Sequence, residues 1–156
     1  MAVQESPRRL PPAAAATALR RDALTAGIAV FALYSIALAA FMAAAPHSFY
    51  AHLGPFGMRN DHYIRDTATF NAAIGAGLLI ALRRPSWRVP MLAITAVQFA
   101  LHSVNHLVDI DKAHPAWNGY FDFFSLAAAT VLLGLLFRIA RADAEVGRAR
   151  TRKIRS

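Results

Sequence analysis

The sequence predicts an all-α integral membrane protein, a polytopic bundle of four transmembrane helices with both termini in the cytoplasm. Of the 156 residues, 56% are hydrophobic and only 17% are charged. The charged residues lie mostly outside four apolar blocks. Most of the Lys and Arg residues lie in connecting and terminal segments on the same predicted side of the membrane. A soluble domain of this size rarely combines such apolarity with so few charges, whereas a membrane bundle requires both.

Each apolar block is close to the length that a helix needs to cross a hydrocarbon core of about 30 Å. The first block has 23 residues without a charge and rises about 35 Å as a helix. The second is short, at residues 67–82, so we expect its helix to begin earlier, near Asn60 or Asp61. The four predicted spans are residues 23–45, 61–82, 89–108 and 121–140.

The distribution of Lys and Arg predicts the orientation, because positive residues near span ends stay in the cytoplasm. Fourteen of the 17 Lys and Arg residues precede the first span, separate the second from the third, or follow the fourth. The flanking segments are predicted to be cytoplasmic tails, disordered and basic at residues 1–22 and Arg-rich at residues 141–156. Since the basic residues lie outside the apolar core, we expect no nucleic-acid partner.

The polar chemistry is concentrated on the predicted outer side, where all six histidines fall. One face of the third span is polar, although the rest of that helix is apolar. The residues spaced along this face are Gln98, His102, Asn105, His106 and Asp109. Lipid does not tolerate such a stripe, so we expect it to face the bundle interior or a wet, outward-opening cavity formed chiefly by spans two and three.

The pair His102 and His106, one helical turn apart, can present two imidazole nitrogens to one metal ion. His62 and Asp66 have the same spacing at the start of the second span. Nitrogen and oxygen donors of this kind suit zinc, copper(II) or non-haem iron. The predicted metal ligands are His102, His106, His62, Asp66 and Asp109. The predicted surrounding ligand-binding or hydrogen-bonding residues are Asn105, Gln98, Asn71, Arg65 and Asp122, of which Asp122 is a further candidate ligand.

Simpler interpretations stay open for several of these residues. The two histidines of the third span are also explained as interfacial residues that hydrogen-bond to Asp109 or to the backbone. Asp109 lies at the carboxyl end of a helix, where the helix dipole disfavours an acid, so a nearby cation or protonated histidine is expected. Asp66 and Asp122 lie near helix amino termini, where the dipole favours them without any function.

Three classes of function are compatible with these features. The first is a transition-metal site used for catalysis or metal handling. The second is a non-enzymatic accessory or scaffold subunit of a larger membrane complex, or a homo-oligomer, because small residues along the second span let helices approach closely. These small residues are Ala68, Ala72, Ala73, Ala76 and Gly77. The third is a redox protein that binds haem, quinone or lipid. Because His102 and His106 share one helix face, a haem would need a second axial ligand from another helix, and His62 is the natural choice. Haem ranks below a bare metal because these histidines lie near one membrane surface, which leaves little protein to cover a porphyrin.

Other chemistries find no support in the sequence. The chain has no cysteine, which excludes disulfides, thiolate metal sites and a cysteine nucleophile. No nucleophile–base motif, phosphate-binding glycine loop or nucleotide fingerprint is present, so hydrolase and NTPase activities are not indicated.

Three motifs on the predicted spans resemble a known group of proteins. They are Asp61-His62-Tyr63-x-Arg65-Asp66, Phe70-Asn71-Ala72-Ala73-x-Gly75 and His102-x-x-Asn105-His106. Together they resemble small bacterial four-helix membrane proteins of unknown function, broadly similar to the DoxX-like families, over residues 23–140. The resemblance implies a bundle in a bacterial plasma membrane, with the Arg-Asp and Asn positions of the second span on a shared polar face. It carries no activity over to any residue of this chain.

Overall fold

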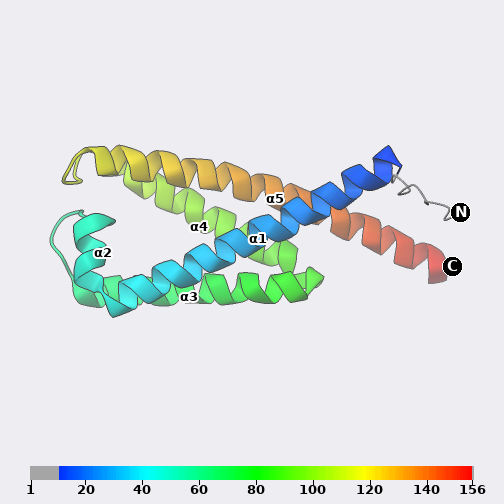
Figure 1. The fold of residues 1–156 in the computed structure, drawn as a ribbon, viewed down its shortest axis with the longest axis horizontal. Coiled ribbons are helices and arrows are strands. Elements are labelled where there is room, and N and C mark those ends of the chain that lie inside the picture. The colour runs from blue at the N-terminus through cyan, green and yellow to red at the C-terminus, as the bar shows by residue number, and fades with distance from the viewer. Residues whose placement is uncertain (1–10, 156) are drawn as a thin grey trace, which may run out of the picture.

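The computed structural model describes residues 11–155, and this part of the chain is helical with no strand. Four long helices lie side by side (Figure 1). They are α1 (Pro12–Ala44), α3 (Asp61–Arg83), α4 (Arg88–Val108) and α5 (Trp117–Arg155). A short helix, α2 (Pro46–His52), and a 3-10 turn, η1 (Pro85–Trp87), complete the fold.

Three helices in the described part of the chain are long and apolar enough to cross a membrane. The segments are Ala14–Ala44, Pro85–Val108 and Trp117–Ile154. The prediction of a helical membrane protein is therefore confirmed at this level. The 23-residue helix α3 is not among them, because the polar residues Asp61, Arg65, Asp66 and Asn71 lie in its first half.

Each predicted span overlaps one long helix, and the bounds agree to within one residue for α3 and α4. Helix α3 begins at Asp61, and the side chain of Asn60 caps it by accepting hydrogen bonds from the backbone N–H groups of His62 and Tyr63. Helices α1 and α5 extend beyond their predicted spans. Residues 12–22, assigned from the sequence to a tail, belong to α1, and residues 141–155 continue α5. The rest of the predicted amino-terminal tail, residues 1–10, lies outside the described residues.

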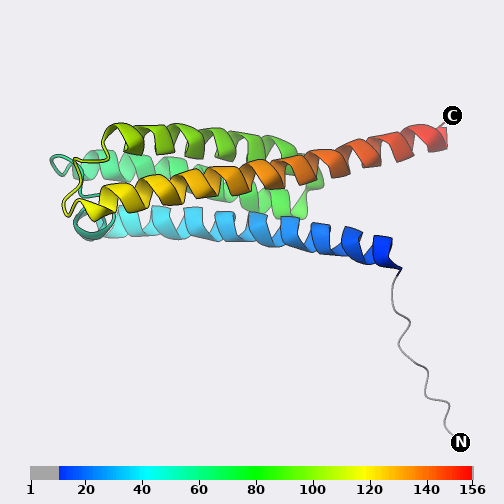
Figure 2. The ribbon, with the colours of Figure 1, turned by 90° about the horizontal axis from the view of Figure 1, so that it is seen from above.

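The bundle is built from two closely packed helix pairs. Helix α1 packs mainly against α3 and helix α4 mainly against α5, while smaller contacts join α3 to α4 and α1 to α5. Figures 1 and 2 show that the start of α1, the turn η1 and the end of α5 lie at one end of the bundle, which we call the η1 end. The α2 end lies opposite and carries α2 and the two connections, residues 53–60 and 109–116.

The core is a column of apolar side chains from all four long helices, while many other apolar side chains point outward. The buried residues include Leu24, Ile28, Leu78, Leu92 and Leu133. Exposed apolar residues on the outer faces include Val30, Leu33, Ile94, Val97, Leu101, Val131 and Leu135. Such a surface is far more apolar than a soluble monomer tolerates, whereas hydrocarbon chains solvate it well.

Gly75 lets α3 approach α1 closely. A Cβ atom on Gly75 would lie 2.7 Å from Cγ1 of Ile36 and 3.1 Å from the Ile36 backbone nitrogen. Apolar side chains gain little free energy by moving from lipid into a helix interface. In a membrane, such close backbone packing therefore supplies much of the helix association energy. Ala68 and Gly77 of the predicted small-residue face are also buried inside the bundle, whereas Ala72, Ala73 and Ala76 remain exposed.

We predict that Gly75→Leu destabilises the bundle by about 1–3 kcal/mol, because the new side chain must displace Ile36 and separate α3 from α1. Thermal unfolding of the detergent-purified protein measures this effect. Ala76→Leu is the matched control, since the neighbouring Ala76 is exposed. Equal unfolding temperatures for the two variants would contradict the proposed close contact.

Candidate functional site

Two imidazole rings face one another near the α2 end of helix α4. His102 and His106 are one turn apart, and their Nε2 atoms are separated by 3.1 Å. The ring centroids lie 4.7 Å apart, and both residues are half-buried. The spacing of the two residues along the helix therefore produces the paired nitrogens that the sequence predicted.

A carboxylate from the next helix lies behind this pair. The Asp122 Oδ2 atom of α5 is 3.9 Å from Nδ1 of His106, on the side of the ring opposite to His102. The two side chains are only 14% and 20% exposed. Both facing atoms are inaccessible to solvent and have no hydrogen-bond partner among residues 11–155. The three side chains form a row, His102, His106 and Asp122, which we call the His–His–Asp row.

The position of Asp122 depends on the tight connection between α4 and α5. At Gly119, in the first turn of α5, a Cβ atom would lie only 2.0 Å from the carbonyl oxygen of Ile110. This close approach brings the start of α5 against the end of α4. The helix dipole alone would account for an acid at this position. The close approach of the two helices also brings Asp122 to the ring of His106.

An aromatic cover closes one side of the row. The ring of Phe56 packs edge-on against His106, with centroids 4.9 Å apart. Phe56 also pairs through its backbone with Ala113, and the His114 N–H donates to the Pro55 carbonyl oxygen at 3.4 Å. The connections 53–60 and 109–116 therefore hold one another over the α2 end.

The turn at Gly57 helps to place this cover. Gly57 has a φ of +59°, a conformation that favours glycine, and its carbonyl oxygen accepts a hydrogen bond from the Tyr50 hydroxyl of α2. The connection at residues 53–60 is thus tied to α2 and to the connection at residues 109–116.

The other three predicted metal ligands lie apart from the row. His62 and Asp66 form their own pair on α3, with Nε2 and Oδ2 3.4 Å apart and side chains 81% and 54% exposed. Asp109 bonds to Lys112, whose Nζ lies 2.6 Å from Oδ1. Within residues 11–155, no group of three or more His, Asp or Glu side chains is arranged to hold a metal ion. The sequence predicted a shell of four or more such groups around His102 and His106, and these residues do not assemble one.

Lys112 supplies the compensation that an acid at the end of α4 was expected to need. Its hydrogen bond with Asp109 raises the pKa of the Lys112 ammonium above its ordinary value, with further contributions from the charges of Asp109 and Asp111. A lysine in the loop is therefore a cation that offsets the unfavourable helix dipole at Asp109.

The predicted surrounding residues divide into those near the row and those away from it. Gln98 is half-buried on the same face of α4 as His102, whereas Asn105 is exposed. On α3, the Asn71 amide donates to the carbonyl oxygen of Thr67 in its own helix at 3.1 Å, and Arg65 is exposed. The cavity was predicted between spans two and three, but the row is formed by α4, α5 and the Phe56 connection.

One residue beside the row, Phe56, was not identified from the sequence. The short connection between α4 and α5 was the available signal for the Asp122 contact, since a short connection makes two helices antiparallel neighbours. No comparable local signal exists for Phe56, which reaches the row through long-range loop packing.

Comparisons of the chain with family models, with curated proteins and with solved structures found no match. The resemblance to DoxX-like proteins stays a prediction.

We predict that Gly119→Ala destabilises the protein by about 1–3 kcal/mol, because its Cβ would meet the backbone of Ile110 rather than a flexible side chain. Thermal unfolding in detergent provides the measurement. Gly134→Ala on the same helix is the control, because nothing lies within 4 Å of its added Cβ. That control should unfold at or above the wild-type temperature, and a Gly119 variant that did the same would contradict the tight connection.

Proposed function

We propose that the protein is a four-span plasma-membrane protein with cytoplasmic termini, whose outer side binds a transition metal through His102 and His106. The observation that carries the proposal is the 3.1 Å separation of the two Nε2 atoms, with the buried Oδ2 atom of Asp122 behind His106. The topology and the metal site rest on different observations and have separate tests.

The packing of α3 supports a fourth span. This helix lies alongside α1 and also contacts α4, so two apolar helices flank it (Figures 1 and 2). Its 23 residues rise about 35 Å, enough to cross a hydrocarbon core. With four spans, fourteen of the 17 Lys and Arg residues lie on the cytoplasmic side and the His–His–Asp row faces outward.

Cysteine labelling tests this topology, and the natural chain contains no cysteine that would interfere. We predict that Met58→Cys and Asp111→Cys react with a membrane-impermeant maleimide in intact cells. Ser86→Cys, in the turn η1, should react only after the membrane is permeabilised. All three positions are exposed in the structure, so accessibility reflects the side of the membrane.

The same experiment distinguishes three spans from four. If α3 did not cross, residues 58 and 86 would lie on one side and residue 111 on the other. That labelling pattern would overturn the four-span topology. The unmodified cysteine-free chain is the control for background labelling.

The geometry of the two imidazoles supports metal binding. Two nitrogen ligands at about 2.0–2.1 Å from a tetrahedral zinc ion lie about 3.3–3.4 Å apart. The observed Nε2 separation of 3.1 Å is close to this value. The same distance also fits a hydrogen bond in which one imidazole donates a proton to the other. A metal ion bound by both Nε2 atoms would therefore take the place of the proton shared between the two rings.

Asp122 has the position of an orienting carboxylate. It lies on the Nδ1 side of His106, so a hydrogen on Nδ1 would point toward Asp122 and leave the Nε2 lone pair for a metal. Histidine ligands commonly donate their second N–H to a carboxylate, which orients the ring and raises its basicity. A shift of about 1 Å would bring the 3.9 Å contact to hydrogen-bond distance.

Two protein ligands leave further coordination positions for water or an external ligand. An open position is required both for metal-assisted catalysis and for transfer of a metal between carriers. Imidazole donors suit zinc, copper and iron, and the outward orientation would give the site access to extracytoplasmic ligands. The proposal therefore covers a small catalytic or metal-handling protein.

Metal loading tests the site directly. We predict that the detergent-purified protein retains about one Zn²⁺, Cu²⁺ or Fe²⁺ ion per chain after loading and desalting. His102→Ala/His106→Ala should lose this ion, because both nitrogen donors are removed. Asp122→Asn should weaken metal affinity by about 10- to 100-fold while still binding one ion at saturation.

The exposed pair on α3 provides a matched control. His62→Ala/Asp66→Ala also removes a histidine and a polar residue one helical turn away from it. This variant should leave the metal content unchanged. A wild-type content below about a tenth of an ion per chain after loading would overturn the metal proposal. Size-exclusion chromatography and circular dichroism of each variant verify that the bundle remains folded.

The two other classes of function have distinct signatures in the same samples. A Soret band or an extractable quinone would favour a redox protein, and a partner that co-purifies from mild detergent would favour an accessory subunit. The accessory interpretation loses part of its original basis, because Ala68 and Gly77 of the small-residue face are buried within the bundle.

A further inference from the structure

A cavity lies at the η1 end of the bundle, opposite the end that holds the His–His–Asp row. It has a volume of about 720 Å³ and is open to its surroundings. It forms where α3 and α4 end at η1 while α1 and α5 continue past them (Figures 1 and 2). Leu24 of α1, Pro85 of η1, Arg88 of α4 and residues 140–152 of α5 contribute to its wall.

The cavity carries a positive charge that the described residues do not neutralise. Arg88, Arg148 and Arg152 line it, whereas Asp143 is the only acidic residue in the lining. None of the three arginines takes part in an ion pair within residues 11–155. The other acid on this part of α5, Glu145, is paired with Arg141 at 3.0 Å.

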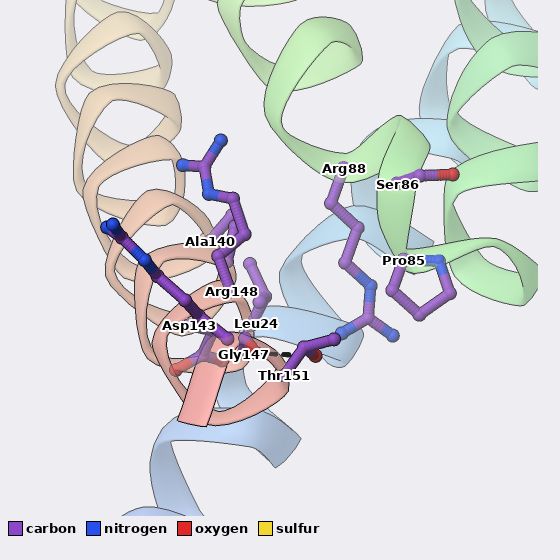
Figure 3. A pocket seen from close by; sticks show the side chains of 11 residues that line it. Leu24, Pro85, Ser86, Arg88, Ala140, Asp143, Gly147, Arg148 and Thr151 are labelled. Atoms are coloured by element: carbon purple, nitrogen blue, oxygen red, sulfur yellow. Dashed lines mark hydrogen bonds between the residues drawn. The ribbon is translucent and has the colours of Figure 1, made fainter. Parts of the chain in front are cut away.

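Arg88 is held in place at the cavity wall. Its Nε donates to the carbonyl oxygen of Ala81 at 3.3 Å, and the side chain is half-buried. Figure 3 shows the side chain extending from the start of α4 toward Thr151 of α5. This bond uses one donor and leaves the two terminal nitrogens of a planar group well suited to phosphate oxygens.

The level of the cavity along the bundle matches that of lipid headgroups. Pro85 begins one of the membrane-spanning segments, and Trp87 beside it is 39% exposed, as an interfacial aromatic would be. Apolar wall residues Leu24 and Ala140 lie next to the arginines. One ligand could therefore place an anionic group against the guanidinium groups and an apolar portion against the bundle.

We infer that this cavity binds a phosphate group, carried by an anionic phospholipid headgroup or present as the free anion. Basic pockets between helices on the cytoplasmic side of membrane proteins bind such headgroups through the same combination of charge and apolar wall. The inference uses the proposed four-span topology to place the cavity at the cytoplasmic leaflet, and it is independent of the metal site.

Native mass spectrometry of the detergent-purified full chain tests the inference, with phosphatidylglycerol and phosphatidylcholine as probes. We expect phosphatidylglycerol to bind the wild type at least about tenfold more tightly than phosphatidylcholine. Arg148→Gln/Arg152→Gln should reduce phosphatidylglycerol binding about tenfold or more, and Arg88→Gln should also reduce it. Equal binding of the two lipids to the wild type would overturn the lipid form of the inference.

A charge-matched variant separates the cavity from the general basicity of α5. Arg141→Gln/Arg150→Gln removes two charges from the same helix segment, and neither residue lines the cavity. It should change phosphatidylglycerol binding by no more than about twofold. A loss equal to that of Arg148→Gln/Arg152→Gln would overturn the inference, because binding would then depend only on net charge.

Inorganic phosphate distinguishes the two sources of the ligand. If millimolar phosphate binds the wild type, displaces phosphatidylglycerol and fails to bind Arg88→Gln, the cavity is supported as a site for the free anion. If phosphatidylglycerol remains bound in that phosphate, the lipid headgroup is supported as the ligand. Binding of neither probe above the level of Arg148→Gln/Arg152→Gln would overturn the inference.

The outcomes are independent of those for the proposed function. Arg148→Gln/Arg152→Gln should keep the metal content of the wild type, since the histidines lie at the other end of α4. Cysteine labelling that placed residue 86 outside would overturn the topology, whereas the lipid measurements would still report on the cavity itself.

Discussion

The unequal lengths of the four long helices organise both ends of this molecule. Helices α3 and α4 have 23 and 21 residues, close to one membrane crossing, whereas α1 and α5 have 33 and 39. All four helices meet the connections at the α2 end, where the loops fold over the bundle. At the other end the shorter pair stops at η1, and the longer pair continues past it (Figure 2). The basic cavity follows from this difference in length.

The chemistry at the α2 end follows from a second constraint, the close return of α5 against α4. Because Gly119 admits the carbonyl oxygen of Ile110, Asp122 lies against His106, and the facing Oδ2 and Nδ1 atoms are inaccessible to solvent. Polar atoms that are buried without hydrogen bonds destabilise a fold. A shared proton or a bound cation would offset that cost, which links the packing of the bundle to the proposed metal chemistry.

The sequence predicted the helices well and their partners less well. The start of α3 at Asp61 was expected from the shortness of the second apolar block, and Asn60 does cap that helix. The spacing of His102 and His106 likewise predicted that the two rings share a face. These successes are local, because helical periodicity relates residues within about two turns of one another. The prediction that α3 residues join that pair required a long-range contact. This contact is absent from the described structure.

The sequence by itself determined the helical architecture, the apolar character typical of a membrane protein and the concentration of histidines at one end. These features follow from hydropathy and charge, which can be assigned residue by residue along the chain. Only the tertiary structure decided which polar groups meet. Asp122 joins His106, Asp109 binds Lys112, and His62 stays with Asp66 on the exposed surface of α3. Helix rotation and the path of the connections determine such contacts, and both depend on the packing of side chains that lie far apart in the sequence.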